Sequence, residues 1–204
     1  MIKNIVFDMG GVLIRFDPPY FISRLGITGE DAALLHREVF RTVEWVKLDR
    51  GTITEKEAVG RMCARLPEHL HEAAAKLVAM WDRPILPFEG MAELIKELKE
   101  AGYGIYLLSN AFTRQHEYWP RVPGNEYFDD TLISADVKLI KPDHAIYHLM
   151  LQKFGLKGEE CVFIDDLPTN IEAAVDCGIN GVVFHSDVSI LRKDLRRMGI
   201  NVAE

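Results

Sequence analysis

The 204-residue sequence contains few cysteines and no long apolar run. Its three cysteines, Cys63, Cys161 and Cys177, are odd in number and include no Cys-x-x-Cys pair, which argues against a disulfide framework and against a zinc site. No apolar stretch approaches the roughly 18 residues that a membrane-spanning helix needs, and the first residues do not resemble a secretory signal peptide. These absences predict a soluble, cytoplasmic protein without a membrane partner.

Basic residues are also scarce. The chain has 24 Lys and Arg against 31 Asp and Glu, a formal net charge of -7. Nucleic-acid binding relies on clustered basic side chains, so we expect no nucleic-acid partner. A small phosphorylated ligand, in contrast, needs only one local cation.

Short β-branched or aliphatic runs recur along the chain with amphipathic helical patterns between them. The runs cover residues 2–7, 104–109, 131–134, 161–165 and 181–184. Helical spacing of apolar residues is clear over 90–102 and 144–155. This alternation is typical of parallel strands joined by crossover helices and predicts an α/β fold, a Rossmann-like three-layer core with a central parallel sheet.

One interval, residues 15–87, breaks this alternation because it contains only helix-like segments. They cover 29–40, 54–66 and 68–81, and the second begins with a Thr54/Glu57 capping box. Prolines mark both edges of the interval. We therefore predict a core formed by 1–14 and 88–204 and a small helical domain inserted after strand 1. The aromatic and sulfur side chains of this insertion are expected to form its own small core; they include Phe40, Trp45, Met62 and Trp81.

Polar residues follow the predicted strands at the points where each strand ends. They are Asp8 after the first strand, Ser109 and Asn110 after the second, Lys141 beyond the third, and Asp165 with Asp166 after the fourth. Ligands of open parallel sheets bind beyond the carboxyl ends of the strands, so these groups are expected to converge. Individually each has an ordinary explanation as a turn, helix-capping or solvated residue. Together they suit one Mg²⁺ ion and one phosphoryl group.

Four segments that carry these residues resemble the motifs of a known family. "VFDMGGVL", "LLSNAF", "KLIKPDHAIYHLML" and "FIDDLPTNIEAA" are similar, in order and in spacing, to the four motifs of the haloacid dehalogenase superfamily, phosphatase branch. The helical insertion is similar to the cap that this family carries after its first motif. The resemblance implies that Asp8 is a nucleophile forming an aspartyl phosphate. It also implies that Ser109, Asn110 and Gly11 bind the phosphoryl group and that Lys141 neutralises its charge.

The resemblance further implies a magnesium site. Asp166, one oxygen of Asp8 and the carbonyl of Gly10 would bind Mg²⁺, whereas Asp165 would act through a metal-bound water or by positioning a ligand. Asn170 is implied to orient these groups.

The first motif departs from the usual family pattern at Gly10. Most phosphatases of the family carry there a second aspartate, which protonates the leaving oxygen and later activates water. A subgroup with Asp-x-Gly-[Gly/Asn]-Val in this motif, similar to bacterial α-D-glucose-1-phosphatase, also lacks it, and a sugar hemiacetal leaves with less need of protonation. Three residues of the insertion are open candidates for a replacement acid: Asp17, Tyr20 and His36.

These patterns predict a Mg²⁺-dependent phosphatase for a small phosphorylated metabolite, with sugar phosphates among the candidates. One alternative is a phosphate- or metal-binding interaction protein of low turnover, which the glycine at position 10 favours. Another is a metal-independent haloacid dehalogenase, against which the Asp165–Asp166 pair argues. The sequence favours no particular oligomeric state.

Overall fold

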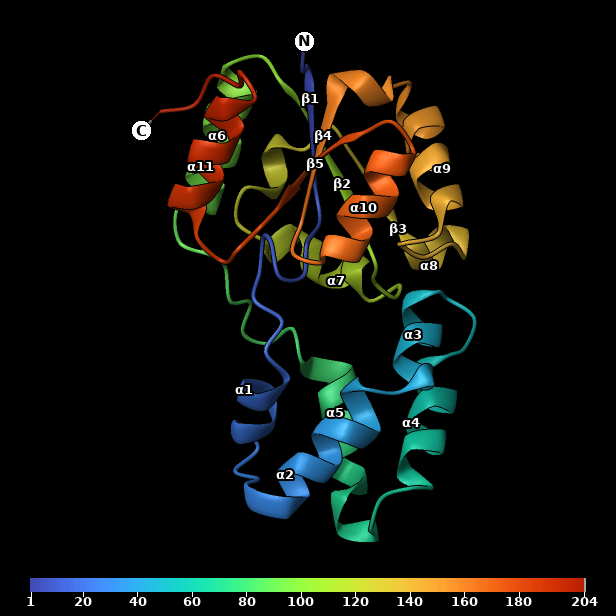
Figure 1. The fold of residues 1–204 in the computed structure, drawn as a ribbon. Helices are drawn as coiled ribbons and strands as arrows, with labels where there is room; N and C mark the ends of the chain where they lie inside the picture. The colour runs from blue at the N-terminus through green and yellow to red at the C-terminus, as the bar shows by residue number, and fades with distance from the viewer. Residues whose placement is uncertain (204) are drawn as a thin grey trace.

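The computed structural model describes residues 1–203 and confirms the predicted α/β fold, with one sheet of five parallel strands (Figure 1). The strand order is β3-β2-β1-β4-β5. The strands are β1 (Asn4–Phe7), β2 (Gly104–Ser109), β3 (Asp130–Ile133), β4 (Cys161–Asp165) and β5 (Asn180–Val183). They start and end within two residues of the predicted runs, which is the usual uncertainty at strand ends.

Helices cover both faces of the sheet, as expected for buried parallel strands rich in Val, Ile and Phe. Alternate residues of β1 point to opposite faces. Ile5 and Phe7 pack in one apolar cluster with α6 and α11, and Val6 packs in a second with α9 and α10. These four helices stand on the two sides of the strands in Figure 1. Their bounds are Met91–Glu100 for α6, His144–Phe154 for α9, Pro168–Asp176 for α10 and Val188–Arg197 for α11.

Short helical segments fill the connections between these layers. They are α7 (Gln115–Tyr118), α8 (Ser134–Val137) and single 3₁₀ turns at Trp119–Arg121, Asn125–Tyr127 and Gly158–Glu160. None of the described helices is long and apolar enough to cross a membrane.

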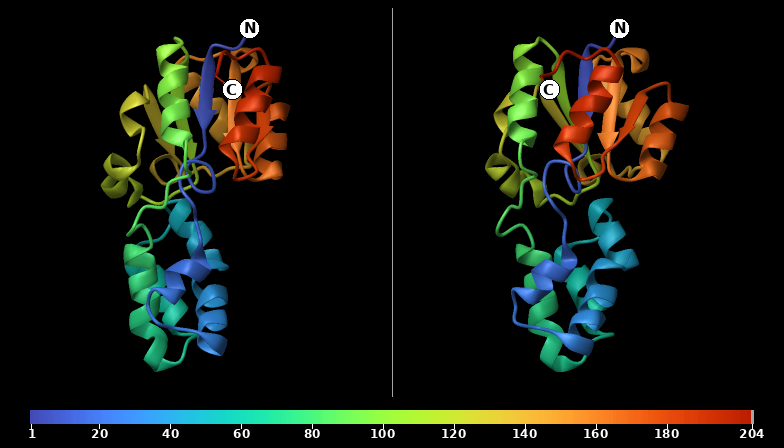
Figure 2. Two further views of the ribbon diagram at one scale, coloured as in Figure 1. Left: turned by 90° about the vertical axis from the view of Figure 1, so that its left-hand side faces the viewer. Right: turned by 60° about the vertical axis from the view of Figure 1, so that its left-hand side comes forward.

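The insertion forms a separate group of helices beyond the carboxyl ends of the strands (Figures 1 and 2). We call it the cap. Its helices are α1 (Pro18–Ser23), α2 (Gly29–Leu35), α3 (Val43–Asp49), α4 (Glu55–Cys63) and α5 (His71–Met80), with a 3₁₀ turn at Glu68–Leu70. The predicted helix over 29–40 changes at His36 into a π-helical turn, His36–Phe40. The capping box at the start of α4 is confirmed in both directions.

The two segments that connect cap and core run side by side. Ile14 and Pro87 form an antiparallel bridge, and the amide of Arg15 donates to the carbonyl of Leu86 at 2.7 Å. This pairing supports the division into a core of 1–14 and 88–204 and a cap of 15–87, which we keep as a proposal. Within the cap, α3 lies nearest to the sheet, below α7 and α8 in Figure 1.

Candidate active site

The lysine predicted to lie at the strand ends is buried among the predicted carboxylates. The Nζ atom of Lys141 lies 2.9 Å from Oδ1 of Asp8 and 2.7 Å from Oδ2 of Asp165. It also donates to the carbonyl of Leu108 at 3.0 Å. The side chains of Lys141 and Asp165 have no exposed surface. Convergence of β1, β4 and the segment after β3 at one edge of the sheet is therefore a property of the fold.

The backbone of this lysine is held by Asn110, at the end of β2. The Asn110 Nδ2 atom donates to the Lys141 carbonyl at 3.0 Å, and Oδ1 accepts from the Lys141 amide at 2.9 Å. One Nδ2 proton of Asn110 is thus used to position Lys141. The second Nδ2 proton is available to donate to a phosphoryl oxygen. Ser109 is fully buried, and its hydroxyl has no hydrogen-bond partner in the described part of the chain.

The two neighbouring carboxylates after β4 have different surroundings. Asp165 accepts from Lys141, from the Leu167 amide at 2.8 Å, and from Nδ2 of Asn170 at 3.0 Å. Both of its oxygens are occupied by protein donors. Asp166 is only partly buried and accepts no side-chain hydrogen bond among residues 1–203. Asp165 is therefore suited to holding Lys141, and Asp166 is the carboxylate available to a ligand.

The site contains three carboxyl groups and one ammonium group, and burial acts on the pKa values of Asp8, Asp166 and Lys141. Burial raises the pKa of Asp8 to about 7; Lys141 acts against this rise and Asp165 adds to it. Burial and the charge of Asp165 also raise the pKa of Asp166. Burial alone would lower the pKa of Lys141, but Asp8 and Asp165 raise it, so the lysine stays charged. The site carries excess negative charge that a cation would relieve.

The donor set fits a hard divalent cation. Asp8, Asp165 and Asp166 each offer an oxygen, and these oxygens lie within 4.8 Å of one another. Such oxygen ligands suit Mg²⁺. The carbonyl of Met9 accepts from the amides of Val12, Leu13 and Ile14, whereas among the described residues no backbone amide donates to the carbonyl of Gly10.

Gly11 makes room for the carboxylate of Asp166. Its φ is +83°, and a Cβ there would lie 2.5 Å from the Asp166 carboxyl group. A side chain at this position would therefore occupy the place of Asp166. Position 10 is different, because a Cβ on Gly10 would meet only Cβ of Phe16, at 3.9 Å. The absence of a second aspartate at Gly10 is not a steric requirement of the turn.

A cavity of about 340 Å³ opens above these groups, between core and cap. One end is polar and is lined by residues that include Asp8, Gly11, Asn110, Lys141, Asp166 and Asn170. The other end is aromatic, with Phe16, Trp45, Trp81, Phe112 and Tyr118. Neighbouring rings of this aromatic wall have centroids 5.1 to 5.9 Å apart. Ser109 lies beside the cavity rather than among its lining residues.

This wall corrects one sequence-based prediction. Met62 is fully buried in the apolar cluster, as expected. Trp45 and Trp81 belong to the same cluster but also line the cavity, so their role is not confined to the interior of the cap. The Nε1 atom of Trp81 is buried and has no partner among the described residues. The helical periodicity of the sequence could not distinguish packing in the apolar cluster from lining the cavity, because both require a side chain that points inward.

The cap also places a carboxyl group in the cavity that sequence reasoning missed. Asp49, the last residue of α3, lines it, whereas Asp17, Tyr20 and His36 do not. Asp17 instead caps α1, accepting from the Tyr20 amide at 3.0 Å. The available signal was the Asp-Arg-Gly sequence at 49–51, where a helix ends, but the seven-residue helix before it was itself not predicted.

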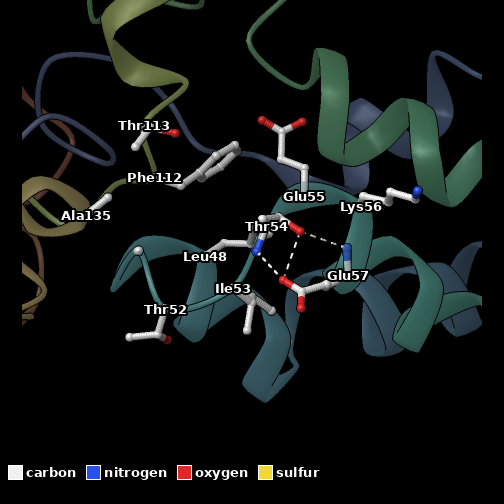
Figure 3. A pocket seen from close by; sticks show the side chains of 11 residues that line it. Leu48, Thr52, Ile53, Thr54, Glu55, Lys56, Glu57, Phe112, Thr113 and Ala135 are labelled. Atoms are coloured by element: carbon white, nitrogen blue, oxygen red, sulfur yellow. Dashed lines mark hydrogen bonds between the residues drawn. The ribbon is translucent and has the colours of Figure 1, made fainter.

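A second hollow of about 590 Å³ lies where residues 51–57 face Phe112, Thr113 and Ala135 (Figure 3). Its most ordered polar feature is the capping box between Thr54 and Glu57, drawn with dashed lines. None of the strand-end residues reaches it. The smaller cavity is therefore the candidate active site.

Comparison with known proteins agrees with this architecture. D-ribitol-5-phosphate phosphatase of Bacteroides thetaiotaomicron is 25% identical over 210 residues, which cover 94% of this chain and 98% of that protein. Drimenol cyclase drtB of Aspergillus calidoustus is 26% identical over 198 residues, covering 95% of this chain; the chain spans only 36% of that protein's length.

Among solved structures, a haloacid dehalogenase family enzyme of Bacteroides thetaiotaomicron, crystallised with magnesium and inorganic phosphate, superposes with a TM-score of 0.70. Its sequence is 23% identical, and the match covers 94% of this chain and 99% of that one. The sequence of residues 2–178 matches the family model of the haloacid dehalogenase-like hydrolases. The chain belongs to the haloacid dehalogenase-like hydrolase family.

Proposed function

We propose that this protein is a Mg²⁺-dependent phosphatase that hydrolyses a small phosphorylated metabolite through an aspartyl-phosphate intermediate. The observation that carries the proposal is the pairing of Asp8 with buried Lys141, beside the free carboxylate of Asp166, at the polar end of the cavity between core and cap. A relative named as a phosphatase, similar along nearly its whole length, supports the choice of phosphate esters as substrates.

The polar end of the cavity has the groups that a phosphoryl group requires. Lys141 provides a fixed positive charge, and the turn at Gly11 brings backbone close to the ligand without a side chain. Asn110 and Ser109 are the further donors we assign to the phosphoryl oxygens. The Ser109 hydroxyl is buried at the end of β2 without a partner, which is unfavourable unless a ligand or water satisfies it.

The magnesium ligands that we assign are Asp8, Asp166 and the carbonyl of Gly10. When bound, Mg²⁺ neutralises the carboxylates and the phosphate and so lets one anion approach the other. We assign Asp165 to positioning, because its oxygens are occupied by Lys141, Asn170 and Leu167.

The reaction proceeds in two displacements at phosphorus. In the first, a carboxylate oxygen of Asp8 attacks phosphorus, the bond from phosphorus to the ester oxygen breaks, and the alcohol leaves with an added proton. In the second, water attacks the same phosphorus, the bond to Asp8 breaks, and inorganic phosphate forms as the water gives up a proton. Splitting the hydrolysis in this way replaces one difficult step by two easier ones. Lys141 keeps Asp8 oriented and favours its ionised form in both.

A comparison of three proteins tests the proposal. Purified wild-type protein with Mg²⁺ should hydrolyse p-nitrophenyl phosphate and members of a panel of sugar phosphates, nucleotides and phospho-acids. Asp8→Asn keeps the shape but removes the nucleophile and should reduce turnover to background. Asp176→Asn, the same change at a side chain 61% exposed at the end of α10, should behave as wild type. Equal turnover of wild type and Asp8→Asn would refute the proposal.

Gly10 favours a second candidate, a phosphate- or metal-binding protein of low turnover, because a proton donor usually contributes about 10²–10⁴ in rate. That function predicts Mg²⁺ and phosphate binding with no catalytic difference between wild type and Asp8→Asn. Haloacid dehalogenation by Asp8 would need no metal and would leave Asp166 without a task. Turnover of 2-haloacids that persists in EDTA would identify that reaction.

A further inference from the structure

The proposed chemistry needs a proton donor that the core does not supply at position 10. An alkoxide is a poor leaving group, so the ester oxygen must receive a proton as its bond to phosphorus breaks. Gly10 has no side chain, although the turn has space for a Cβ there. Of the carboxyl groups that line the cavity, Asp8 is the nucleophile and Asp166 is assigned to the metal. Asp49 is the remaining one.

Contacts between cap and core hold Asp49 in place. Its backbone carbonyl accepts a hydrogen bond from the hydroxyl of Ser134, which is fully buried at the start of α8. Two residues later, Gly51 has a φ of +69° and lies so close to Ala135 that a Cβ would collide with the Ala135 backbone. Phe112, which follows β2 in the core, lines the same cavity, and its backbone N–H acts to lower the pKa of the Asp49 carboxyl group. The main chain of Asp49 is therefore positioned by the core.

The place of Asp49 in the cavity matches the place of a leaving group. In a phosphoryl transfer the attacking and leaving oxygens lie roughly in line with phosphorus between them. Asp8 attacks from the sheet, so the leaving oxygen points toward the opposite wall. That wall is formed by the cap, with Trp45, Asp49 and Trp81.

We propose that Asp49 is the general acid of this active site. Its carboxyl proton passes to the ester oxygen as the bond between that oxygen and phosphorus breaks. The resulting carboxylate then takes a proton from the water that hydrolyses the aspartyl phosphate, which restores the acid. The inference rests on the phosphatase function proposed above.

The surroundings of Asp49 favour an acid that keeps its proton. Aromatic rings form much of the cavity beside it, and burial raises the pKa of Asp49 well above its usual range. The negative charge of Asp8 acts in the same direction, and the Phe112 N–H opposes it. The ionisable groups that share the cavity with Asp49 are Asp8, Asp166, Lys141 and Tyr118.

The test compares leaving groups of different acidity with holoenzyme in saturating Mg²⁺. Glycerol phosphate needs protonation of its leaving oxygen, whereas p-nitrophenolate leaves without it. In Asp49→Asn, we expect turnover of glycerol phosphate to fall by about 10²–10⁴. Release of p-nitrophenolate in the first turnover should change only a few-fold. Asp31→Asn, the same change on the cap surface, should alter neither rate. Equal losses for both substrates, or no loss, would overturn the inference.

A second variant distinguishes loss of the proton donor from loss of activity caused by a disturbed structure in Asp49→Asn. Adding Gly10→Asp restores an acid at the usual family position, where a Cβ would meet only Cβ of Phe16, at 3.9 Å. It should raise glycerol phosphate turnover by a much larger factor in Asp49→Asn than in the wild type, because only the variant lacks a donor. The same factor in both backgrounds would contradict a role for Asp49 in proton transfer.

The same measurements distinguish failure of the phosphatase proposal from failure of the Asp49 assignment. If wild-type protein hydrolyses neither ester, or if Asp8→Asn is as active as wild type, the phosphatase proposal fails and Asp49 has no reaction to assist. If Asp8→Asn abolishes both reactions while Asp49→Asn leaves their ratio unchanged, the phosphatase stands and only the assignment of the acid is wrong.

Discussion

Replacing Lys141 by Met tests the arrangement at the centre of the site through stability rather than activity. Methionine keeps most of the apolar stem but removes the ammonium that lies 2.9 Å from Asp8 and 2.7 Å from Asp165. Removing one partner of a buried ion pair leaves an uncompensated charge and typically costs about 3–5 kcal/mol of unfolding free energy. For a chain of this length, 1 kcal/mol lowers Tm by roughly 2–4 °C. The expected decrease in Tm is therefore about 6–20 °C at pH 7.5 without metal.

The assay is urea and thermal unfolding of wild type, Lys141→Met and a control, followed by circular dichroism. Lys96→Met is the matched control, because Lys96 lies on α6 with 54% of its side chain exposed and should change stability by less than about 0.5 kcal/mol. The deficit of Lys141→Met should shrink at acid pH, because burial raises the pKa of Asp8 to about 7 and this carboxyl group then takes up a proton. A Lys141→Met protein as stable as the Lys96→Met control at pH 7.5 would refute a buried lysine between two carboxylates.

Three further outcomes follow from the described contacts. Mg²⁺ at 100 times its Kd should stabilise the wild type by about 2.7 kcal/mol, reversibly with EDTA, and Asp166→Asn should lose most of that gain in thermal unfolding. Gly11→Ala should destabilise the fold by at least about 1–2 kcal/mol, because φ is positive at Gly11 and the added Cβ would collide with the carboxylate of Asp166. Gly60→Ala, inside α4 and with open space around it, should instead stabilise the fold by about 0.5–1 kcal/mol. Equal urea midpoints for the two variants would contradict this difference. The raised pKa of Asp49 means that the folded state holds this proton more tightly than the unfolded state, so its stabilising effect is complete below the ordinary value of 3.8 and is lost as pH rises. Asp49→Asn should match wild-type Tm near pH 3.5 and exceed it at pH 8, and a constant difference across that range would contradict a raised pKa of this carboxyl group.

The sheet and one side of the site could be predicted from the sequence because parallel strands impose both. A buried strand is short, apolar and β-branched, and its end is marked by the first polar residue. Asp8 and Asp165 satisfy this rule, and the fold brings their strands together as neighbours, β1 beside β4. Once the strands are parallel, their final residues must share an edge, which brings Asp8 close to Asp165. Lys141 is not a strand-final residue, because α8 lies between β3 and Lys141, so its contact with both carboxylates also depends on that connection.

The opposite side of the site could not be predicted, because it depends on how the cap lies against the core. Asp49 is placed by a hydrogen bond to a residue 85 positions away, and such a contact leaves no periodic pattern in the sequence. Its helix is only seven residues long and exposes Val43 and Val46, so the apolar spacing that identified longer helices is blurred there. The candidates weighed instead, Asp17, Tyr20 and His36, lie in the cap but do not line the cavity.

The paired connections at Ile14 and Pro87 have a consequence for how this enzyme family can diversify. The nucleophile, the lysine and the groups assigned to the metal lie outside residues 15–87, whereas the proposed acid Asp49 lies inside that interval, with Trp45 and Trp81 on the same wall of the cavity. One continuous stretch of gene therefore encodes the choice of ester, and it could be exchanged between relatives at two adjacent junctions while the metal-binding rim of the sheet is inherited intact.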